Sequence, residues 1–467
     1  MHLHVFRLDL IGYHVWRQTQ TQTVINNFYK EDNNILHPRI NDRADTNRIF
    51  KMEFPVMQWL FALFYKIFGN YIIISRILTF LIGIGSVFGM FFLCNAIFKN
   101  RILAVIAAWT FNFSPVFYYY TVNPLPDNFA LFCGIWSGVF LFQYKNNERI
   151  VYILLSALLL GLATLTKLPF VLYSVAFFVF GIILLKNDSN KYKQVLLVYS
   201  LYLVTLLPAF IWYIQVVPGW GGNGIVRGIL GNKETFATLF DILQFTVVST
   251  LPELLINYGS VLFFIAGGYF LLKRKAFNNS YFPIFLLWGC AIVFYFLFEM
   301  NMIGKVHDYY LFPFLPLIFI LVAYGCYHLL RGKQRFLQYL SFFALLLLPV
   351  TAFLRADARW NTEDPGFNAT YYKYKDQLRL LTPQNAYCIV GNDDSHYILL
   401  YYIDRKGWAF DNNGLNEERL SYYISKGACY LFTDSPIDND PSIKKHLGDK
   451  IFDKETLRVY KLQADLK

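Results

Sequence analysis

Residues 71–98 read YIIISRILTFLIGIGSVFGMFFLCNAIF, an apolar run longer than the roughly 20 residues needed to cross the hydrocarbon core of a membrane. Similar runs recur along the chain until about residue 354 and then stop. We expect ten membrane helices, at residues 71–98, 102–121, 127–143, 150–166, 169–185, 195–216, 258–272, 281–299, 309–330 and 336–354. Segment 54–68 is amphipathic, and segment 236–257 is interrupted by charges and proline. We expect the first to lie at the membrane interface and the second to be interfacial or re-entrant.

The composition excludes a cytosolic enzyme and a disordered chain. Of 467 residues, 56% are hydrophobic and 19% aromatic, and only 16% are charged. Soluble domains carry about 25% charged residues, so this chain has too few to cover a soluble surface. The net charge of +11 indicates basic loops on the cytoplasmic side and contact with anionic lipid, rather than nucleic acid. The fold predicted is mainly α, a multi-pass transmembrane bundle.

The basic residues between the predicted helices indicate the orientation. One set of alternate loops holds thirteen: Lys99, Arg101, Lys145, Arg149, Lys186, Lys191, Lys193, Lys273, Arg274, Lys275, Arg331, Lys333 and Arg335. The other set holds four: Lys167, Arg227, Lys233 and Lys305. The first set is therefore expected to face the cytoplasm. Residues 1–70 then lie outside, although no apolar run or signal peptide precedes them. Either they are cytoplasmic and the topology is wrong, or an upstream helix is absent from this sequence; we expect the second.

The composition changes at about residue 355. Residues 355–467 hold nearly equal numbers of basic and acidic residues, and short apolar strands at 386–390 and 428–432 alternate with helix-like stretches. We therefore expect three parts: a first outer loop with interfacial helices (1–70), a transmembrane domain (71–354) and a small α/β domain outside the membrane (355–467). Cys388 and Cys429 lie in the two strands. They are either a disulfide, if the strands are neighbours, or two buried thiols.

Polar side chains gather in the loops assigned to the outer face. Arg17, Arg39, Lys167 and His307 with the carboxylates Glu53, Asp127 and Asp308 would suit a phosphate-bearing substrate and a proton acceptor. Asp9, Gln18, Gln20, Tyr309 and Tyr310 lie in the same loops. Other roles remain open: Asp127 could cap a helix, His307 could be a hydrogen-bonded interfacial side chain, and the two tyrosines could belong to an interfacial aromatic belt.

Six stretches, in order, resemble the C-type glycosyltransferases that take sugars from polyprenyl-phosphate donors. These stretches are GYHVWRQTQT (12–21), NFYKEDNNILHPRI (27–40), EFPVMQWLFALFYKIFG (53–69), SPVFYYYTVNPLPDNFALF (114–132), LATLTKLP (162–169) and HDYYLFPFLPLIF (307–319). The tail stretch YYIDRKGWAF (401–410) also resembles tails of this group. The chain is most similar to the bacterial relatives of protein O-mannosyltransferase and of the lipid A aminoarabinose transferase.

The resemblance implies an enzyme of the bacterial inner membrane that moves a sugar from an undecaprenyl-type lipid phosphate to a hydroxyl on the periplasmic face. The acceptor would be a cell-envelope glycan, lipid or protein. Arg17, Lys167 and His307 would hold the donor phosphate, together with Gln18, Arg39, Asp308, Tyr309 and Tyr310 as further substrate-binding residues. No cofactor is firmly implied. Some C-type members depend on a divalent metal, but this branch is not characterised by one, so a metal is not expected.

The chain departs from the family pattern at Gln20, where relatives usually carry the acidic residue thought to act as base. A glutamine does not accept a proton usefully near neutral pH. We expect a neighbour, Glu53, Asp127 or Asp9, to have taken this role. The alternatives are a catalytically silent member that binds lipid-linked glycan, or a transporter or flippase of the lipid-linked sugar.

Overall fold

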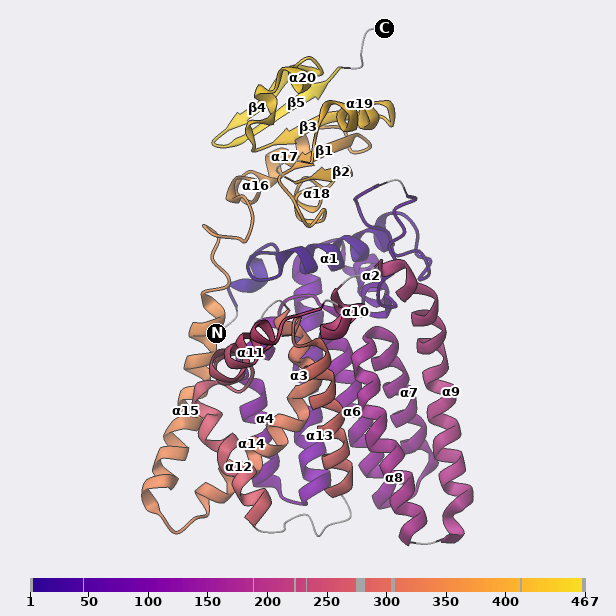
Figure 1. Cartoon of the computed structure of the whole chain (residues 1–467), viewed down its shortest axis with the longest axis vertical. Helices are drawn as coiled ribbons and strands as arrows, with labels where there is room; N and C mark the ends of the chain where they lie inside the picture. The colour runs from indigo at the N-terminus through magenta and orange to yellow at the C-terminus, as the bar shows by residue number, and fades with distance from the viewer. Residues whose placement is uncertain are drawn as a thin grey trace. The chain divides into compact units, whose positions relative to one another are not determined.

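The computed structural model describes residues 3–44, 46–187, 189–221, 224–231, 233–273, 282–303, 307–411 and 414–463. The chain divides into two compact units (Figure 1). The membrane unit consists of Met1–Phe6, Met52–Met57 and Ser75–Asp357, and the sheet unit consists of Arg7–Lys51, Gln58–Ile74 and Ala358–Lys467. Arg274, Lys275 and Lys305, which entered the predicted orientation, lie outside the described residues.

Helices form nearly all of the membrane unit. They are α3 (Ile72–Phe98), α4 (Arg101–Asn112), α5 (Pro115–Tyr120), α6 (Pro126–Asn147), α7 (Ile150–Thr166), η2 (Leu168–Tyr173), α8 (Ser174–Asn187), η3 (Ser189–Lys191), α9 (Tyr192–Val216), η4 (Val217–Trp220), α10 (Gly224–Gly231), α11 (Phe236–Phe245), η5 (Thr246–Leu255), η6 (Tyr258–Ser260), α12 (Val261–Lys273), α13 (Phe282–Glu299), η7 (Asp308–Phe314), α14 (Leu315–Leu330) and α15 (Arg335–Asp357). Helix α7 packs against α6 and α9, α14 against α12 and α4, and α13 against α8 (Figure 1).

The predicted transmembrane bundle is confirmed, with differences in individual helices. Among the described residues, six helical runs are long and apolar enough to cross a membrane. These runs are Ile72–Phe98, Leu168–Lys186, Tyr192–Trp220, Phe236–Leu255, Asp308–Leu330 and Arg335–Asp357. Five of them coincide with predicted spans. The sixth, Phe236–Leu255, is the segment expected to be interfacial or re-entrant, and α11 and η5 form one continuous helical run there.

The expected single helix at 102–121 is wrong. The structure has two helices, α4 and α5, with Ser114 in an extended conformation between them. Pro115 explains the break, because proline has no N–H for the preceding turn and disfavours helical geometry in the residue before it. Hydrogen bonds from Ser114 Oγ to Leu255 O and from Asn257 Nδ2 to Phe113 O hold this break in place.

The sheet unit is built around one mixed sheet. Its helices are α1 (Val15–Lys30), α2 (Val56–Phe68), α16 (Ala369–Lys373), α17 (Lys375–Leu381), α18 (Ile398–Ile403), α19 (Glu417–Ser425), η8 (Pro436–Asn439) and α20 (Pro441–Lys444), and η1 (Val5–Arg7) precedes it. Its strands are β1 (Tyr387–Gly391), β2 (Lys406–Phe410), β3 (Ala428–Thr433), β4 (Leu447–Lys454) and β5 (Leu457–Leu462), in the order β2-β1-β3-β5-β4. Strand β1 is parallel to β2 and β3, and β5 is antiparallel to β3 and β4.

Each face of this sheet carries its own apolar core. Val390 and Leu399 belong to the core on one face, and Ile389 and Leu420 belong to the core on the other, as the alternation of side chains along a strand requires. The N-terminal part of the chain joins the unit at β2, because Arg43 N donates a hydrogen bond to Gly407 O at 2.7 Å. The small α/β domain predicted near the C-terminus is therefore present, and residues far earlier in the sequence pack with it.

The two cysteines do not form a disulfide. In the parallel pairing of β1 with β3, Cys388 lies opposite Tyr430, not opposite Cys429. Both thiols are free, with Cys388 buried and Cys429 exposed. The expectation of a disulfide or of two buried thiols is thus wrong for Cys429, although the two strands are neighbours. Burial raises the pKa of the Cys388 thiol to about 12.

Candidate active site

Lys167 lies at the centre of a charged cluster in the membrane unit. Its Nζ is 3.3 Å from Asp127 Oδ2 and 4.0 Å from Glu53 Oε2. All three side chains are almost fully enclosed, with 12%, 4% and 7% of their surfaces exposed. Charges removed from water in this way are costly unless they are paired, and such pairs usually have a function in membrane proteins.

The local sequence explains why Lys167 can reach both carboxylates. Helix α7 ends at Thr166, and Lys167 has extended backbone angles (φ −148°, ψ 112°) before η2 begins. Pro169 in the first turn of η2 has no N–H to continue the hydrogen bonds of α7. The lysine therefore leaves the helix at its end rather than from its side.

Asp127 lies in the first turn of α6, and not at its N-cap. The cap residue is Leu125, and Pro126 is the first helical residue. The alternative that Asp127 caps the helix is therefore wrong, although a carboxylate in the first turn still interacts favourably with the helix dipole. Asn128 Nδ2 donates to Tyr120 O at 2.9 Å and to Asn123 O at 3.2 Å, which fixes the turn that leads into α6.

Glu53 is held beside the end of α7 by its two neighbours in the sequence. Phe54 N donates to Leu165 O at 3.4 Å, and Trp212 Nε1 donates to Met52 O at 2.9 Å. The rings of Phe54 and Trp212 meet edge to face at 4.9 Å between centroids. Residues from α9 and from α7 thus position a segment that has no helical structure of its own.

The start of η7 completes the cluster. The rings of Tyr309 and Tyr310 have their centroids 5.7 and 5.8 Å from Lys167 Nζ, within range of a cation–π interaction. The ring of His307 lies 5.4 Å from that of Tyr309 and 5.1 Å from that of Tyr310. Asp308 is fully buried and accepts a hydrogen bond from Tyr120 Oη at 2.6 Å.

The other predicted site residues belong to the sheet unit. Arg17 and Gln20 are both buried in α1, and the Arg17 guanidinium donates to Gln20 Oε1. Gln18 Nε2 donates to Tyr13 O at 3.0 Å. Arg39 donates to Asn47 O at 2.9 Å and lies 3.8 Å from Asp32, contacts that shape its own loop.

Asp9 has an environment that favours a structural role over that of a base. It accepts hydrogen bonds from Tyr401 Oη at 2.7 Å and Leu10 N at 2.9 Å, and it pairs with Lys375 at 3.1 Å and Arg379 at 3.5 Å. Burial by itself would raise its pKa, but Lys375, Arg379 and the two hydrogen bonds outweigh burial and lower it. A carboxylate held ionised in this way is a weak proton acceptor.

Two polar residues of the membrane unit were not predicted. Arg76 in α3 is fully buried and donates to Val122 O at 2.8 Å and to Asn123 Oδ1 at 2.9 Å. Tyr120 donates the hydrogen bond to Asp308. It lies in the stretch FYYY (117–120), whose composition is equally typical of aromatic side chains at a membrane interface. An arginine inside an otherwise apolar helix is the signal that could have identified Arg76. The sequence carries no comparable signal for Tyr120.

Known proteins are similar to this chain in sequence pattern and in fold. Residues 53–212, which include Glu53, Asp127 and Lys167, match the family described as dolichyl-phosphate-mannose-protein mannosyltransferase. ArnT from Cupriavidus metallidurans in the apo state is similar in structure, with a TM-score of 0.65 at 14% identity over 98% of this chain and 95% of that one. ArnT from the same organism bound to undecaprenyl phosphate gives a TM-score of 0.64 at 12% identity over 99% and 95%. No curated protein sequence was found that matches the chain. Residues 53–212 thus carry the sequence pattern of the mannosyltransferase family and the whole chain has the fold of ArnT, which confirms the predicted resemblance to the C-type glycosyltransferases.

Proposed function

We propose that this protein is a membrane glycosyltransferase that moves a sugar from an undecaprenyl-type phosphate donor to a hydroxyl of a cell-envelope acceptor, at the periplasmic face of the bacterial inner membrane. The observation that carries the proposal is the enclosed contact of Lys167 with Asp127 and Glu53. This cluster combines a cation that can bind a phosphate group with carboxylates that can accept a proton. The binding of undecaprenyl phosphate by ArnT, which has the same fold, supports the choice of donor.

Lys167 would bind the phosphate of the donor. Its ammonium now lies between two carboxylates, and an arriving phosphate oxygen would compete with them for it. As the bond between the sugar carbon C1 and the phosphate oxygen breaks, negative charge grows on that oxygen, and a nearby cation stabilises it. Arg17 and His307 are proposed as further donor-binding residues.

A carboxylate released from Lys167 would accept the proton of the acceptor hydroxyl. The acceptor oxygen forms its bond to C1 while the phosphate leaves, and the hydroxyl proton passes to the carboxylate, so the lipid departs as a phosphate anion. Glu53 is the proposed base because, at 4.0 Å, it is held less closely by Lys167 than Asp127 is at 3.3 Å. Asp127 would then keep Lys167 oriented. By resemblance to the family, the reaction inverts the configuration at C1.

An apolar cavity in the same unit suits the lipid part of such a donor. It has a volume of about 780 Å³, within the range of ligand pockets, and is lined by side chains of η5, α12, α13 and α14. Leu311 and Phe314 of η7 also line it, and η7 begins with Asp308 and the two tyrosines beside Lys167. One short helix therefore contacts both the charged cluster and the apolar cavity.

The test is sugar transfer by the purified chain in lipid nanodiscs, using radiolabelled undecaprenyl-phosphate sugars and a cell-envelope extract as acceptor. We expect Glu53→Gln to lower transfer at least about a hundredfold, because loss of a general base costs 10²–10⁴-fold. Gln20→Ala should retain much of the activity. Glu148→Gln, an exposed glutamate of the same unit, serves as matched control. Full activity in Glu53→Gln with loss in Gln20→Ala would overturn the choice of base.

One observation favours a second candidate function, a silent protein that binds lipid-linked glycan. The Gln20 amide accepts a hydrogen bond from Arg17 where an acidic residue is usual in the family. This candidate predicts no transfer by the unmodified chain in the assay above, together with saturable binding when undecaprenyl phosphate is titrated onto the chain in nanodiscs.

A further inference from the structure

A cavity of about 580 Å³ in the sheet unit belongs to none of the sites described so far. Three segments line it: residues 12–16 at the start of α1, residues 358–367 after α15, and residues 392–399 after β1. Gly12 N donates to Pro365 O at 2.8 Å and ties the first two segments together. Gly366 has φ +87°, and a Cβ there would lie 3.0 Å from Gly12 O, so this wall of the cavity has no room for a side chain.

The topology of the sheet favours a binding site at this place. From β1 the chain passes through α18 to β2 on one side, whereas β3, on the other side of β1, leads on towards β4 and β5. In open α/β sheets, ligands bind outside the carboxyl ends of the strands. The loop that follows β1 lines the cavity, whereas the described residues that follow β3 do not. Residues Asn392–Ser395 directly follow β1 and line the cavity.

The polar groups of the cavity differ in what they can offer a ligand. Asp393 is buried and accepts hydrogen bonds from Leu399 N at 2.8 Å and Ser395 N at 3.1 Å, so it holds the loop. Asp364 and Asp394 are exposed at the cavity. Asn392 Oδ1 is buried and has no hydrogen-bond partner among the residues that the structure describes. The exposed carboxylates of Asp364 and Asp394 are therefore the acceptors that a ligand can reach, whereas Asn392 Oδ1 is enclosed.

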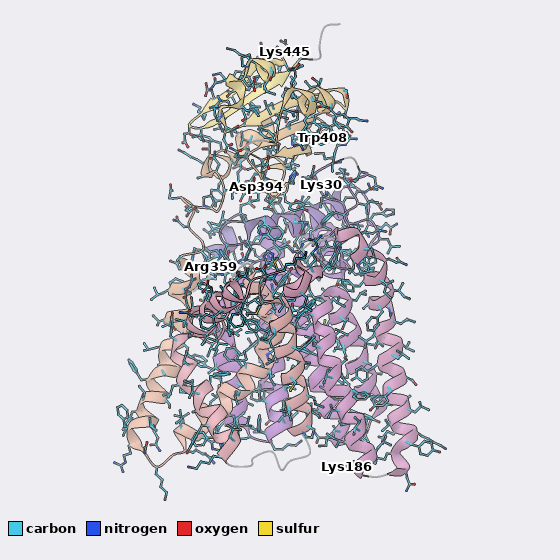
Figure 2. All side chains as sticks on the ribbon, in the orientation of Figure 1. Lys30, Lys186, Arg359, Asp394, Trp408 and Lys445 are labelled. Carbon is cyan, nitrogen blue, oxygen red and sulfur yellow. The ribbon has the colours of Figure 1, made fainter. Side chains whose placement is uncertain are left out.

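Aromatic rings and one arginine form the rest of the lining. The Arg359 guanidinium lies 4.5 Å from the centroid of the Tyr13 ring, and Trp16 and Phe367 also line the cavity. Figure 2 marks Arg359 and Asp394, two members of this lining. Aromatic side chains beside exposed carboxylates, which accept hydrogen bonds from hydroxyls, are a combination suited to carbohydrates.

We propose that this cavity binds a carbohydrate that is neutral or carries an amine, and that this carbohydrate is part of the acceptor. A phosphate group would be disfavoured, because the exposed charges of Asp364 and Asp394 outnumber that of Arg359. That the carbohydrate is the acceptor rests on the proposed function, whereas its binding does not.

The first test measures binding to the full chain in nanodiscs by saturation-transfer NMR, with maltotriose, a glucosamine trimer and glucose 6-phosphate as probes. We expect maltotriose or the glucosamine trimer to bind with a dissociation constant below about 10 mM, a weak interaction of about 3 kcal/mol. The Asp364→Asn/Asp394→Asn variant should weaken this binding about tenfold, as loss of charged hydrogen bonds does. Both residues are exposed, so the fold should be retained. Glu418→Gln, exposed in α19, is the matched control.

The outcomes separate this inference from the proposed function. Tighter binding of glucose 6-phosphate than of the other probes, no binding of any probe, or equal binding by the double variant would overturn the carbohydrate site. If glycan binding is lost in the double variant while no transfer is found in any preparation, the carbohydrate site is supported and the proposed glycosyltransferase activity is rejected. If transfer occurs and the double variant raises the acceptor KM about tenfold with little change in kcat, both stand.

Discussion

Arg76 shows how single residues of the membrane unit prepare the charged cluster without belonging to it. Its guanidinium is fully buried and bonds to Val122 O and Asn123 Oδ1. Asn123 Nδ2 in turn donates to Tyr119 O at 2.9 Å, so the turn between α5 and α6 is fixed from both sides. Asp127 follows this turn directly. The arginine is therefore a positioning residue for the carboxylate that contacts Lys167.

Replacing Arg76 by leucine should destabilise the protein by about 1–3 kcal/mol, because two buried acceptors lose their donor. Arg76→Lys keeps a cation and should cost less. The measurement is the apparent melting temperature in detergent, with Arg101→Leu at the exposed start of α4 as control. An unchanged melting temperature in Arg76→Leu would contradict the role assigned to these hydrogen bonds.

Among helices and strands, the sequence predicted best those whose ends are set by local chemistry. Helix α7 covers residues 150–166 as expected, because Lys167-Leu168-Pro169 ends it. The helix expected at 102–121 is divided by Pro115. Interfacial helices were expected within residues 1–70, but none was placed at α1, since its sequence VWRQTQTQTVINNFYK has no clear apolar face. Contacts with residues more than 350 positions away stabilise this helix. Local patterns do not contain such contacts.

The contacts of Asp9 with α17 and α18 are also long-range in sequence, and their contribution to stability should depend on pH. The folded-state pKa of Asp9 is lowered, so its stabilising effect is present above the unfolded pKa and is lost as the pH falls through the folded value. Asp9→Asn should cost about 3 kcal/mol near pH 7, the scale for breaking a buried ion pair. The cost should begin to shrink as the pH falls below about 4, the unfolded value, and should vanish only below the lowered folded value, where the folded residue is protonated as well.

Hydrogen exchange of peptides from α17 and α18, compared between the two proteins at each pH, measures this cost. Asp376→Asn, exposed in α17, is the control. Equal protection of Asp9→Asn and the unmodified chain at pH 7 would show that Asp9 does not hold these helices.

At the scale of the whole molecule, composition and apolar runs were enough to predict the membrane bundle, since lipid imposes its requirement on every helix. The charged cluster is different, because Glu53, Asp127, Lys167 and Tyr309 are far apart in sequence and no spacing rule joins them. Their place in the loops assigned to the outer face predicted that they share a site, and the resemblance to the C-type family agreed with that prediction. Only the structure shows that the lysine contacts both carboxylates. It also shows that Asp9 and Gln20 lie in the sheet unit.

Donor binding tests the central claim most directly. Radiolabelled undecaprenyl phosphate is titrated onto the full chain in nanodiscs, and its dissociation constant is compared among the unmodified protein, Lys167→Ala, Lys167→Arg and Glu53→Gln. Lys193→Ala, an exposed lysine of the same unit, is the control. We predict binding at least about tenfold weaker in Lys167→Ala, because a phosphate contact loses its cation, with most of the affinity kept in Lys167→Arg and Glu53→Gln. Binding by Lys167→Ala that equals that of the unmodified chain would contradict the assignment of Lys167 as the phosphate ligand.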